Sequence, residues 1–326
     1  MNKFILALTF IALALALTPE VKEEKKAFKK FQKFITKYGK TYFLIQEYMA
    51  RFKIFKKSLL KRNSAGLYKK GITQFSDLTE NEFRRTYLNL DINVLNTIKY
   101  TDIDVVATGN ADDTFNWVEK EALGKIKNQG SCGSCWAFSA VGNLEGLYWI
   151  KYSENKRFSE QQLVDCDDVD EGCNGGLMEY TFAWIKKNGG LKLEEDYPYK
   201  GRDQTCKQDV TKNVVKVADF VKLTTTDEEA IKDYLFQTGP LAIALNANPL
   251  QYYYGGIVDD DASSCEPEGL NHGVVLVGYG TIDDGIDYWI VRNSWGASLG
   301  EKGYFRMLRG KGTCGINTYV TSAILE

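Results

Sequence analysis

The seven cysteines of this chain set the strongest limit on what it can fold into. They stand at positions 132, 135, 166, 173, 206, 265 and 314. In an oxidising compartment most cysteines pair, so an odd number leaves one thiol over. The simplest arrangement is three bridges and one free thiol, although spacing alone does not choose among the 15 pairings of six cysteines.

The N-terminus predicts that the chain enters such a compartment. After the basic Lys3, residues 4–17 are apolar or small apart from one Thr, and Ala14 and Ala16 have the spacing that a signal peptidase recognises. We therefore expect residues 1–18 to be a signal peptide. A membrane anchor is the alternative, but 14 helical residues span only about 21 Å of a bilayer core about 30 Å thick. We expect no membrane span in the mature protein.

Charge divides the chain into a basic and an acidic part. Residues 1–110 carry 20 Lys and Arg against 10 Asp and Glu, whereas residues 111–326 carry 21 against 33. A basic segment of this kind could bind nucleic acid. We favour a partner within the chain, because Phe28, Phe31 and Ile35 lie at helical spacing among the lysines and require a protein surface. No nucleic-acid partner is expected.

Residues 19–110, called the leader here, have a helical pattern. Apolar residues at helical spacing predict helices over 21–38 and 48–59. Thr79, with Glu82 three residues later, predicts the capped start of a short third helix. The leader is therefore expected to be a helical domain of its own.

A linker joins the leader to residues 111–326, called the body here. Residues 91–113 are polar with little periodicity and are expected to be exposed and open to proteolysis. In the body, an almost wholly apolar stretch at 135–150 predicts a buried helix with Ser134 as its cap. Further elements are a helix at 177–188 and strands at 241–245, 273–278, 288–291 and 304–308. We expect an α+β fold of two lobes, one helical and one of strands, with a cleft between them.

The segment Gln129-Gly-Ser-Cys132-Gly-Ser-Cys135-Trp136 is the strongest local signal. A Cys-x-x-Cys pair can be a redox centre or half of a zinc site. Zinc is disfavoured because the chain has one histidine, and no clear strand precedes the pair as a redox fold would require. A third interpretation places Cys132 in a bridge and leaves Cys135 free at a helix N-terminus, which favours the reactive thiolate.

A thiolate nucleophile needs an imidazole partner and a group that orients the ring. His272 is the only histidine and precedes an apolar strand. Asn293 follows another apolar strand and could orient the ring, while Trp295 could shield that contact from water. Taken singly, each of these residues is more often structural than catalytic.

Four blocks together resemble the papain family of cysteine proteases over essentially the whole body. They are Gln129 to Trp136 followed by Ala-Phe-Ser, Cys173-Asn-Gly-Gly176, Asn271-His272-Gly, and Asn293-Ser-Trp-Gly296. The resemblance implies the two-lobed papain-like fold, a helical lobe plus a β-barrel-like lobe. It also implies a cysteine endopeptidase without a metal or organic cofactor, acting on proteins and peptides.

The leader resembles the inhibitory propeptide of the same family. Glu47, Arg51 and Phe55 match the first half of its helical motif, and Gly71-x-Thr-x-Phe-x-Asp77 matches its second motif. Three positions depart from the rest of the helical motif: Ser58, Arg62 and Gly66 stand where Asn, Ile and Asn are usual. This pattern is more similar to cathepsin F-like members than to cathepsin L. The leader is therefore expected to inhibit its own body.

The resemblance implies a role for each site residue. Cys135 would be the nucleophile, His272 the general acid and base, Asn293 the orienting amide, and Gln129 an oxyanion donor. The implied substrate-binding residues are Gly175, Gly176, Leu177, Met178, Ala244, Leu270, Asn271, Trp295 and Tyr319. The implied bridges are Cys132–Cys173, Cys166–Cys206 and Cys265–Cys314. A catalytically inactive family member is the alternative, but such proteins usually lose one of the catalytic residues.

Leu177, Met178, Ala244, Leu270 and Tyr319 would line the pocket for the residue two before the scissile bond. Because no carboxylate is among them, we expect this pocket to prefer Leu or Val over a basic residue, with Phe disfavoured by the Tyr319 ring. We expect a monomer in a lysosome or acidic vacuole, or outside the cell.

Overall fold

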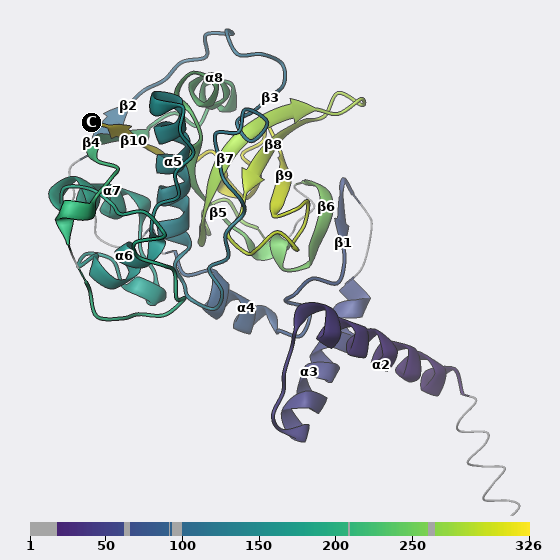
Figure 1. Cartoon of the computed structure of the whole chain (residues 1–326). Helices are drawn as coiled ribbons and strands as arrows, with labels where there is room; N and C mark the ends of the chain where they lie inside the picture. The colour runs from purple at the N-terminus through teal and green to yellow at the C-terminus, as the bar shows by residue number, and fades with distance from the viewer. Residues whose placement is uncertain (1–17, 62–65, 91, 93–99, 208, 260–264) are drawn as a thin grey trace, which may run out of the picture.

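The computed structural model describes residues 18–61, 66–90, 92, 100–207, 209–259 and 265–326. Apart from Thr18, the predicted signal peptide lies outside these residues. Within the described ranges, no helix combines the length and apolarity that a membrane crossing requires. The leader helices project from a body that holds one large sheet and a group of helices beside it (Figure 1).

Ten described strands form this sheet, in the order β1-β6-β9-β8-β7-β5-β10-β4-β2 with β3 paired to β7. The body strands are β3 (Phe115–Asn116), β4 (Val217–Leu223), β5 (Leu241–Leu245), β6 (Tyr253–Val258), β7 (His272–Thr281), β8 (Asp287–Arg292), β9 (Tyr304–Leu308) and β10 (Val320–Leu325). Pairs are antiparallel except β6 with β9 and β2 with β4. β7 is buried at every position but its last, as expected of a strand covered on both faces.

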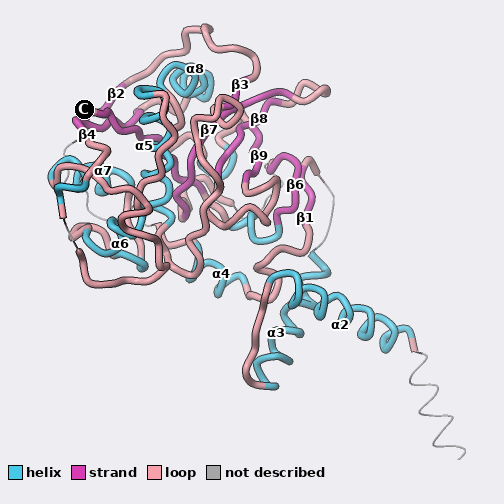
Figure 2. The backbone as a smooth tube through the Cα atoms, in the orientation of Figure 1, coloured by secondary structure: helices cyan, strands magenta, loops and turns pink. Residues whose placement is uncertain are grey.

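Helices α5 (Cys135–Tyr152), α6 (Glu160–Cys166) and α7 (Met178–Lys187) make the helical lobe, and α8 (Glu228–Thr238) lies apart from them. Figure 2 shows α5, α6 and α7 on one side of the molecule and the long strands β7, β8 and β9 on the other. The fold is therefore the predicted two-lobed α+β arrangement.

Helix α5 packs directly on β7. Gly142 faces this contact, because a Cβ added there would lie 2.5 Å from Val275. Ser139 donates a hydrogen bond to the carbonyl of Val274 at 2.6 Å. The apolar, small-residue sequence of α5 thus permits an unusually close approach of helix and strand. Ser134 occupies the cap position but makes no capping bond, because its hydroxyl pairs with Tyr199 instead.

The leader begins with two helices packed through aromatic rings. They are α2 (Pro19–Tyr38) and α3 (Ile45–Ser58), close to the predicted ranges. Phe31 is fully buried and contacts the rings of Phe52 and Phe55 on α3. The aromatic face of α2 therefore binds α3 inside the leader and does not rest on the body.

The rest of the leader lies along the body. Helix α4 (Glu80–Tyr87) has the predicted capping box between Thr79 and Glu82. Strand β1 (Tyr68–Lys70) pairs with β6, and β2 (Thr101–Ile103) pairs with β4. The leader thus occupies both edges of the sheet. The linker was expected to lack structure, and β2 is a correction: its residues gain backbone partners only when the edge of β4 is present.

Charge does not bind the leader to the body through contact ion pairs. In the described part of the leader, each ion pair joins two leader residues, for example Lys40 with Asp77 and Arg51 with Glu82. The buried Asp77 also accepts a hydrogen bond from Tyr42. Leader and body are held instead by strand pairing and by apolar contacts such as Phe75 against Trp295.

In the Phe31→Ala variant, the pair of leader helices α2 and α3 should unfold at a lower denaturant concentration than in the parent chain. The substitution removes a fully buried ring, and such a loss lowers the free energy of unfolding by about 3–5 kcal/mol. Phe43→Ala is the control, because that ring is 90 % exposed. Urea unfolding of the full chain, followed by far-UV circular dichroism, measures the difference. Equal midpoints for the two variants would contradict the packing described here.

Candidate active site

Cys135 is the first residue of α5 and the one cysteine without a bridge. Its side chain is fully buried. Gly273, the second residue of β7, lies against it: a Cβ there would be 3.2 Å from the carbonyl oxygen of Cys135. The close contact of α5 and β7 therefore brings the starts of both elements, Cys135 and His272, to the same place.

His272 is fully buried and oriented from two sides. Its Nε2 lies 2.9 Å from Oδ1 of Asn293, and the ring of Trp295 stacks on it at 4.5 Å between centroids. An amide oxygen only accepts, so Nε2 is the protonated nitrogen of the neutral ring. Nδ1 is buried without a hydrogen-bond partner among the described residues, and it is the nitrogen free to accept a proton.

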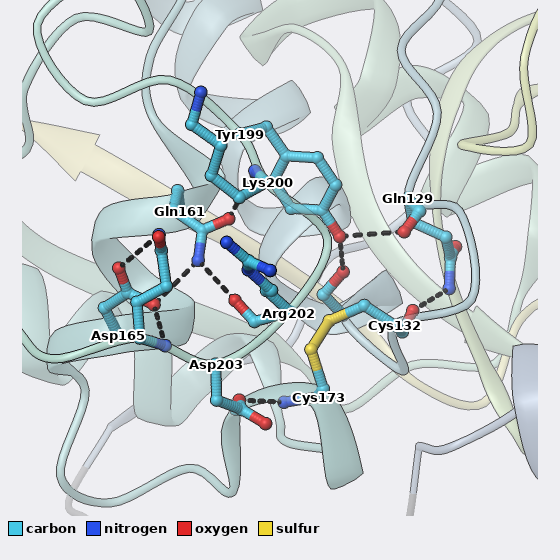
Figure 3. Close-up of a disulfide and its surroundings, with 12 residues drawn as sticks. Gln129, Cys132, Gln161, Asp165, Cys173, Tyr199, Lys200, Arg202 and Asp203 are labelled. Atoms are coloured by element: carbon cyan, nitrogen blue, oxygen red, sulfur yellow. Dashed lines mark hydrogen bonds between the residues drawn. A yellow bond between two sulfur atoms is a disulfide. The ribbon is translucent and has the colours of Figure 1, made fainter.

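Gln129 lies in the loop before α5. Its Nε2 donates to the carbonyl of Cys132 at 3.0 Å, and its Oε1 accepts from the hydroxyl of Ser294 at 2.7 Å. The Tyr199 hydroxyl donates to the backbone carbonyl of Gln129 (Figure 3). These bonds use one of the two amide hydrogens of Gln129 and leave the second for another acceptor.

A buried ion-pair cluster fixes the start of this loop. Lys127 Nζ lies 2.6 Å from Glu145 Oε1 and 2.7 Å from Glu160 Oε1, all three side chains being nearly inaccessible. The carbonyl of Lys127 accepts a hydrogen bond from Gly296. The cluster therefore ties the Gln129 loop to the segment that carries Asn293.

Three disulfides stabilise the body: Cys132–Cys173, Cys166–Cys206 and Cys265–Cys314. These are the pairs that the family resemblance implies. In Figure 3 the first of them joins the Gln129 loop to the segment that begins at Cys173, whose backbone N–H donates to Asp203. The redox interpretation of Cys-x-x-Cys is wrong for this structure, because Cys132 is paired elsewhere.

The leader crosses the site through Asn89 and Leu90. The backbone N–H of Leu90 donates to the carbonyl of Asn271 at 3.2 Å. Asn89 approaches Gly175 so closely that a Cβ on that glycine would lie 2.3 Å from its carbonyl oxygen. Gly176 is likewise closed to a side chain, since a Cβ would lie 2.6 Å from Asp170. Glycines here let an extended chain lie against the backbone.

The residues predicted for the substrate pocket come together in one apolar cluster. Leu177, Met178, Ala244, Leu270 and Tyr319 belong to it. The same cluster contains the leader residue Leu90, with Ile92 packed against it. A leader side chain therefore lies among the groups expected to receive a substrate side chain.

The sequence analysis missed a carboxylate beneath this cluster. Glu179 is fully buried on α7 and accepts a hydrogen bond from the Tyr319 hydroxyl at 2.5 Å. Lys222 Nζ lies 3.8 Å from its other oxygen and 4.2 Å above the Tyr319 ring. Burial raises the pKa of Glu179, while Tyr319 and Lys222 oppose that rise. In the sequence, the only sign of this buried carboxylate was its position two residues after Leu177, which was predicted to line the pocket.

Burial keeps Cys135 and His272 neutral in this form of the chain. It raises the pKa of the Cys135 thiol to about 11 and lowers the pKa of His272 to about 4. The helix N-terminus does favour the thiolate, as expected, but burial outweighs it in this form of the chain. Backbone N–H groups, that of the leader residue Asn89 among them, lower the pKa of the thiol, but the cost of burying the charge is larger.

Comparison with known proteins agrees with this geometry. Residues 111–324 match the model of the family described as "Papain family cysteine protease". This chain belongs to the papain family. Residues 31–83 match the "Cathepsin propeptide inhibitor domain", so the leader is the propeptide of a papain-family zymogen. Both matches bear out the resemblance seen in the motifs.

Curated relatives include two cathepsins F and a plant protease. The chain is 42 % identical to cathepsin F of Drosophila melanogaster over 306 residues, which cover 90 % of this chain and 50 % of the fly protein. It is 39 % identical to cathepsin F of Mus musculus, and the match covers 91 % of this chain and 64 % of the mouse protein. It is 40 % identical to cysteine proteinase 15A of Pisum sativum, and the match covers 90 % of this chain and 85 % of the pea protein. The chain thus spans half to two-thirds of these cathepsins F.

Solved zymogens of the papain family have the same fold. The digestive procathepsin L2 proteinase of Tenebrio molitor larval midgut superposes with a TM-score of 0.86 at 32 % identity, covering 92 % of this chain and all of that one. The recombinant stem bromelain precursor superposes with a TM-score of 0.83 at 33 % sequence identity. The match covers 92 % of this chain and 99 % of the bromelain precursor. Propeptide and body therefore have the arrangement of known papain-family precursors.

Alkylation of Cys135 in the zymogen should be slow and should accelerate about tenfold for each pH unit between 7 and 9. With a thiol pKa of about 11, roughly one thiol in 10⁴ is ionised at pH 7. Iodoacetamide labelling of the full chain, quantified by intact mass, measures the rate. Fast, pH-independent labelling would contradict the buried neutral pair.

Proposed function

We propose that this papain-family zymogen matures into a secretory-pathway cysteine endopeptidase that acts through Cys135, His272 and Asn293. The observation that carries the proposal is the buried His272, whose Nε2 is fixed on Asn293 while its Nδ1 has no hydrogen-bond partner in the described part of the chain. Cys135 lies at the start of the neighbouring helix as the only free thiol. A nucleophile, a base and an orienting group thus converge on one site.

The reaction is acyl transfer. His272 takes the Cys135 proton, and the thiolate attacks the scissile carbonyl carbon. Gln129 and the backbone N–H of Cys135 stabilise the oxyanion. His272 then protonates the leaving amine. Water, deprotonated by the same ring, attacks the acyl-enzyme, releasing the carboxylate product and restoring the thiol.

The substrates are extended protein and peptide chains. Support comes from the propeptide itself, whose Asn89 and Leu90 already lie on Asn271, Gly175 and the apolar cluster. Gly175, Gly176 and Asn271 would hydrogen-bond a substrate backbone, and Trp295 would keep water from the His272–Asn293 bond.

The propeptide, residues 19–110, acts as an intramolecular inhibitor because its Asn89 and Leu90 cover the site. The body is proposed to be a monomer that works in a lysosome, an acidic vacuole or the extracellular space. Three disulfides agree with folding in an oxidising compartment.

The pocket for the residue two before the scissile bond is proposed to prefer Leu or Val. The buried Glu179 is not expected to bind a basic substrate side chain, because Tyr319 and Lys222 already compensate its charge. The Tyr319 ring lies between Glu179 and the rest of the apolar cluster and limits the room for Phe. A buried carboxylate is therefore present but masked.

Cys135→Ser should abolish hydrolysis of a fluorogenic peptide by the activated enzyme. Gln129→Ala should lower kcat by about 10²–10³-fold with little change in KM, as expected for loss of one oxyanion donor. Gln237→Ala, at an exposed position of α8, is the control and should leave both constants unchanged. Substantial activity in Cys135→Ser, or a pure KM effect in Gln129→Ala, would disprove the assigned roles.

Tyr319→Ala should deepen the specificity pocket. We expect the ratio of kcat/KM for a Phe substrate to that for a Leu substrate to rise at least about tenfold, within the range that pocket-filling groups contribute. An Arg substrate should also become acceptable, because removing the phenol unmasks Glu179.

The double variant Tyr319→Ala/Glu179→Gln separates the two effects. It should keep the gain for Phe, which depends on pocket depth, and lose the gain for Arg, which depends on the carboxylate. A peptide library varied at this one position measures both. If Arg were already favoured by the parent enzyme, the masking of Glu179 would be wrong.

A further inference from the structure

Asp233 of the body anchors the linker at Thr108 and Gly109. Asp233 on α8 is 3 % exposed, and its Oδ2 accepts three hydrogen bonds from the linker. The donors are the backbone N–H of Thr108 at 2.5 Å, the Thr108 hydroxyl at 2.8 Å and the backbone N–H of Gly109 at 2.7 Å. The linker therefore has one ordered turn beside α8 (Figure 1).

Among the described residues of the zymogen, this carboxylate has no cationic partner. Burial raises the pKa of Asp233, but the hydrogen bonds from Thr108, Gly109 and the Ala111 backbone outweigh burial and lower it, so the group is ionised. Its Oδ1 is buried without a hydrogen-bond partner among the described residues. The ion pairs of the described chain do not include Asp233, and the adjacent Lys232 pairs with Glu229. A buried charge satisfied only by amides and a hydroxyl leaves a place for a cation.

We propose that maturation cuts the Ala107–Thr108 bond and that the new α-ammonium of Thr108 pairs with Asp233. Hydrolysis breaks the C–N bond and adds one water: Ala107 keeps the carboxylate, and the Thr108 nitrogen becomes an ammonium. That nitrogen already lies on Asp233, so cleavage converts an amide hydrogen bond into a salt bridge without moving the chain. The inference rests on the proposed peptidase function.

The surroundings of this bond favour it over its neighbours. Val106 is 72 % exposed and would enter the pocket that prefers Leu or Val, since it lies two residues before the cut. Cutting one bond earlier would require Val105, which packs against the core of the strand lobe. Val106 and Ala107 are therefore the accessible substrate residues of the linker.

Cleavage at the end of the sequence-predicted leader, between Asn110 and Ala111, is disfavoured for two reasons. Gly109 would then occupy the specificity pocket without a side chain to fill it. The cut would also release Thr108 and Gly109 from Asp233, so the carboxylate would lose the three hydrogen bonds that hold this part of the linker. The structure thus moves the mature N-terminus three residues upstream of that boundary.

A second enzyme molecule must make this cut. Trp117, just after the linker, contacts Trp149 in the last turns of α5, about 21 Å along the helix from Cys135. Asn89 and Leu90 also cover the zymogen's own site. The anchored bond of one zymogen is therefore a substrate for another, already active molecule.

The test uses the full-length Cys135→Ser chain, which does not process itself, and a catalytic amount of activated wild-type enzyme. N-terminal sequencing of the first stable body product should read Thr-Gly-Asn-Ala from Thr108. A first product that begins at Ala111 or elsewhere overturns the inference. Because the same enzyme is assayed on a fluorogenic peptide, failure of the proposed function, with no peptide cleavage, is told apart from a wrong cleavage site.

Two substitutions in the Cys135→Ser substrate test the separate parts of the argument. Val106→Asp should slow the appearance of the Thr108 terminus at least about tenfold, because a charge cannot enter the apolar pocket. Val214→Asp, at another exposed valine, is the control and should be processed at the parent rate. Equal rates for both variants would overturn the role of Val106.

Asp233→Asn tests the new salt bridge. An asparagine keeps an acceptor for the amides but does not neutralise the ammonium, so the mature form should lose at least about 4 °C in Tm while the zymogen changes little. The control is Asp219→Asn, whose exposed carboxylate pairs with Lys186 on the surface. Equal losses in zymogen and mature form would overturn the pairing, because they would show that Asp233 serves the linker turn alone.

Discussion

The close packing of α5 on β7 is the constraint on which the rest of the structure depends. Glycines at 142 and 273 remove the side chains that would separate the two elements. Cys135 and His272 are the first residues of these elements, so the packing of helix on strand brings the proposed nucleophile and base to the same end of the contact. Because both elements are buried in the body, the pair is held by the core and not by a loop.

The propeptide uses the same features of the body that catalysis needs. It pairs with both edges of the sheet and lies across the cleft through Asn89 and Leu90. It thereby excludes water from the site, and burial then disfavours both charged forms of the pair. Inhibition is thus an electrostatic as well as a steric effect, and it ends when the cleft is opened to solvent.

Local pattern predicted the elements that carry a simple periodicity. β5 and β9 begin and end at the predicted residues, and α5 extends the predicted helix by one turn at most. Helices α6 and α8 and strands β4, β6 and β10 were not predicted from the sequence. Helix α6 is only seven residues long and buries polar side chains, and β6 contains two glycines, so neither has the composition of its class. Tertiary contacts stabilise these segments more than their own propensity does.

The sequence by itself determined the family and the candidate chemistry: an odd cysteine, a single histidine and four motif blocks leave Cys135 and His272 as the proposed nucleophile and base. The tertiary structure decided how that chemistry is controlled. It placed Glu179 behind Tyr319 and Asp233 beneath Thr108, pairs separated by more than a hundred residues. No local pattern reports such neighbours, because the burial and partners that set the charge of a carboxylate exist only once distant segments have packed together.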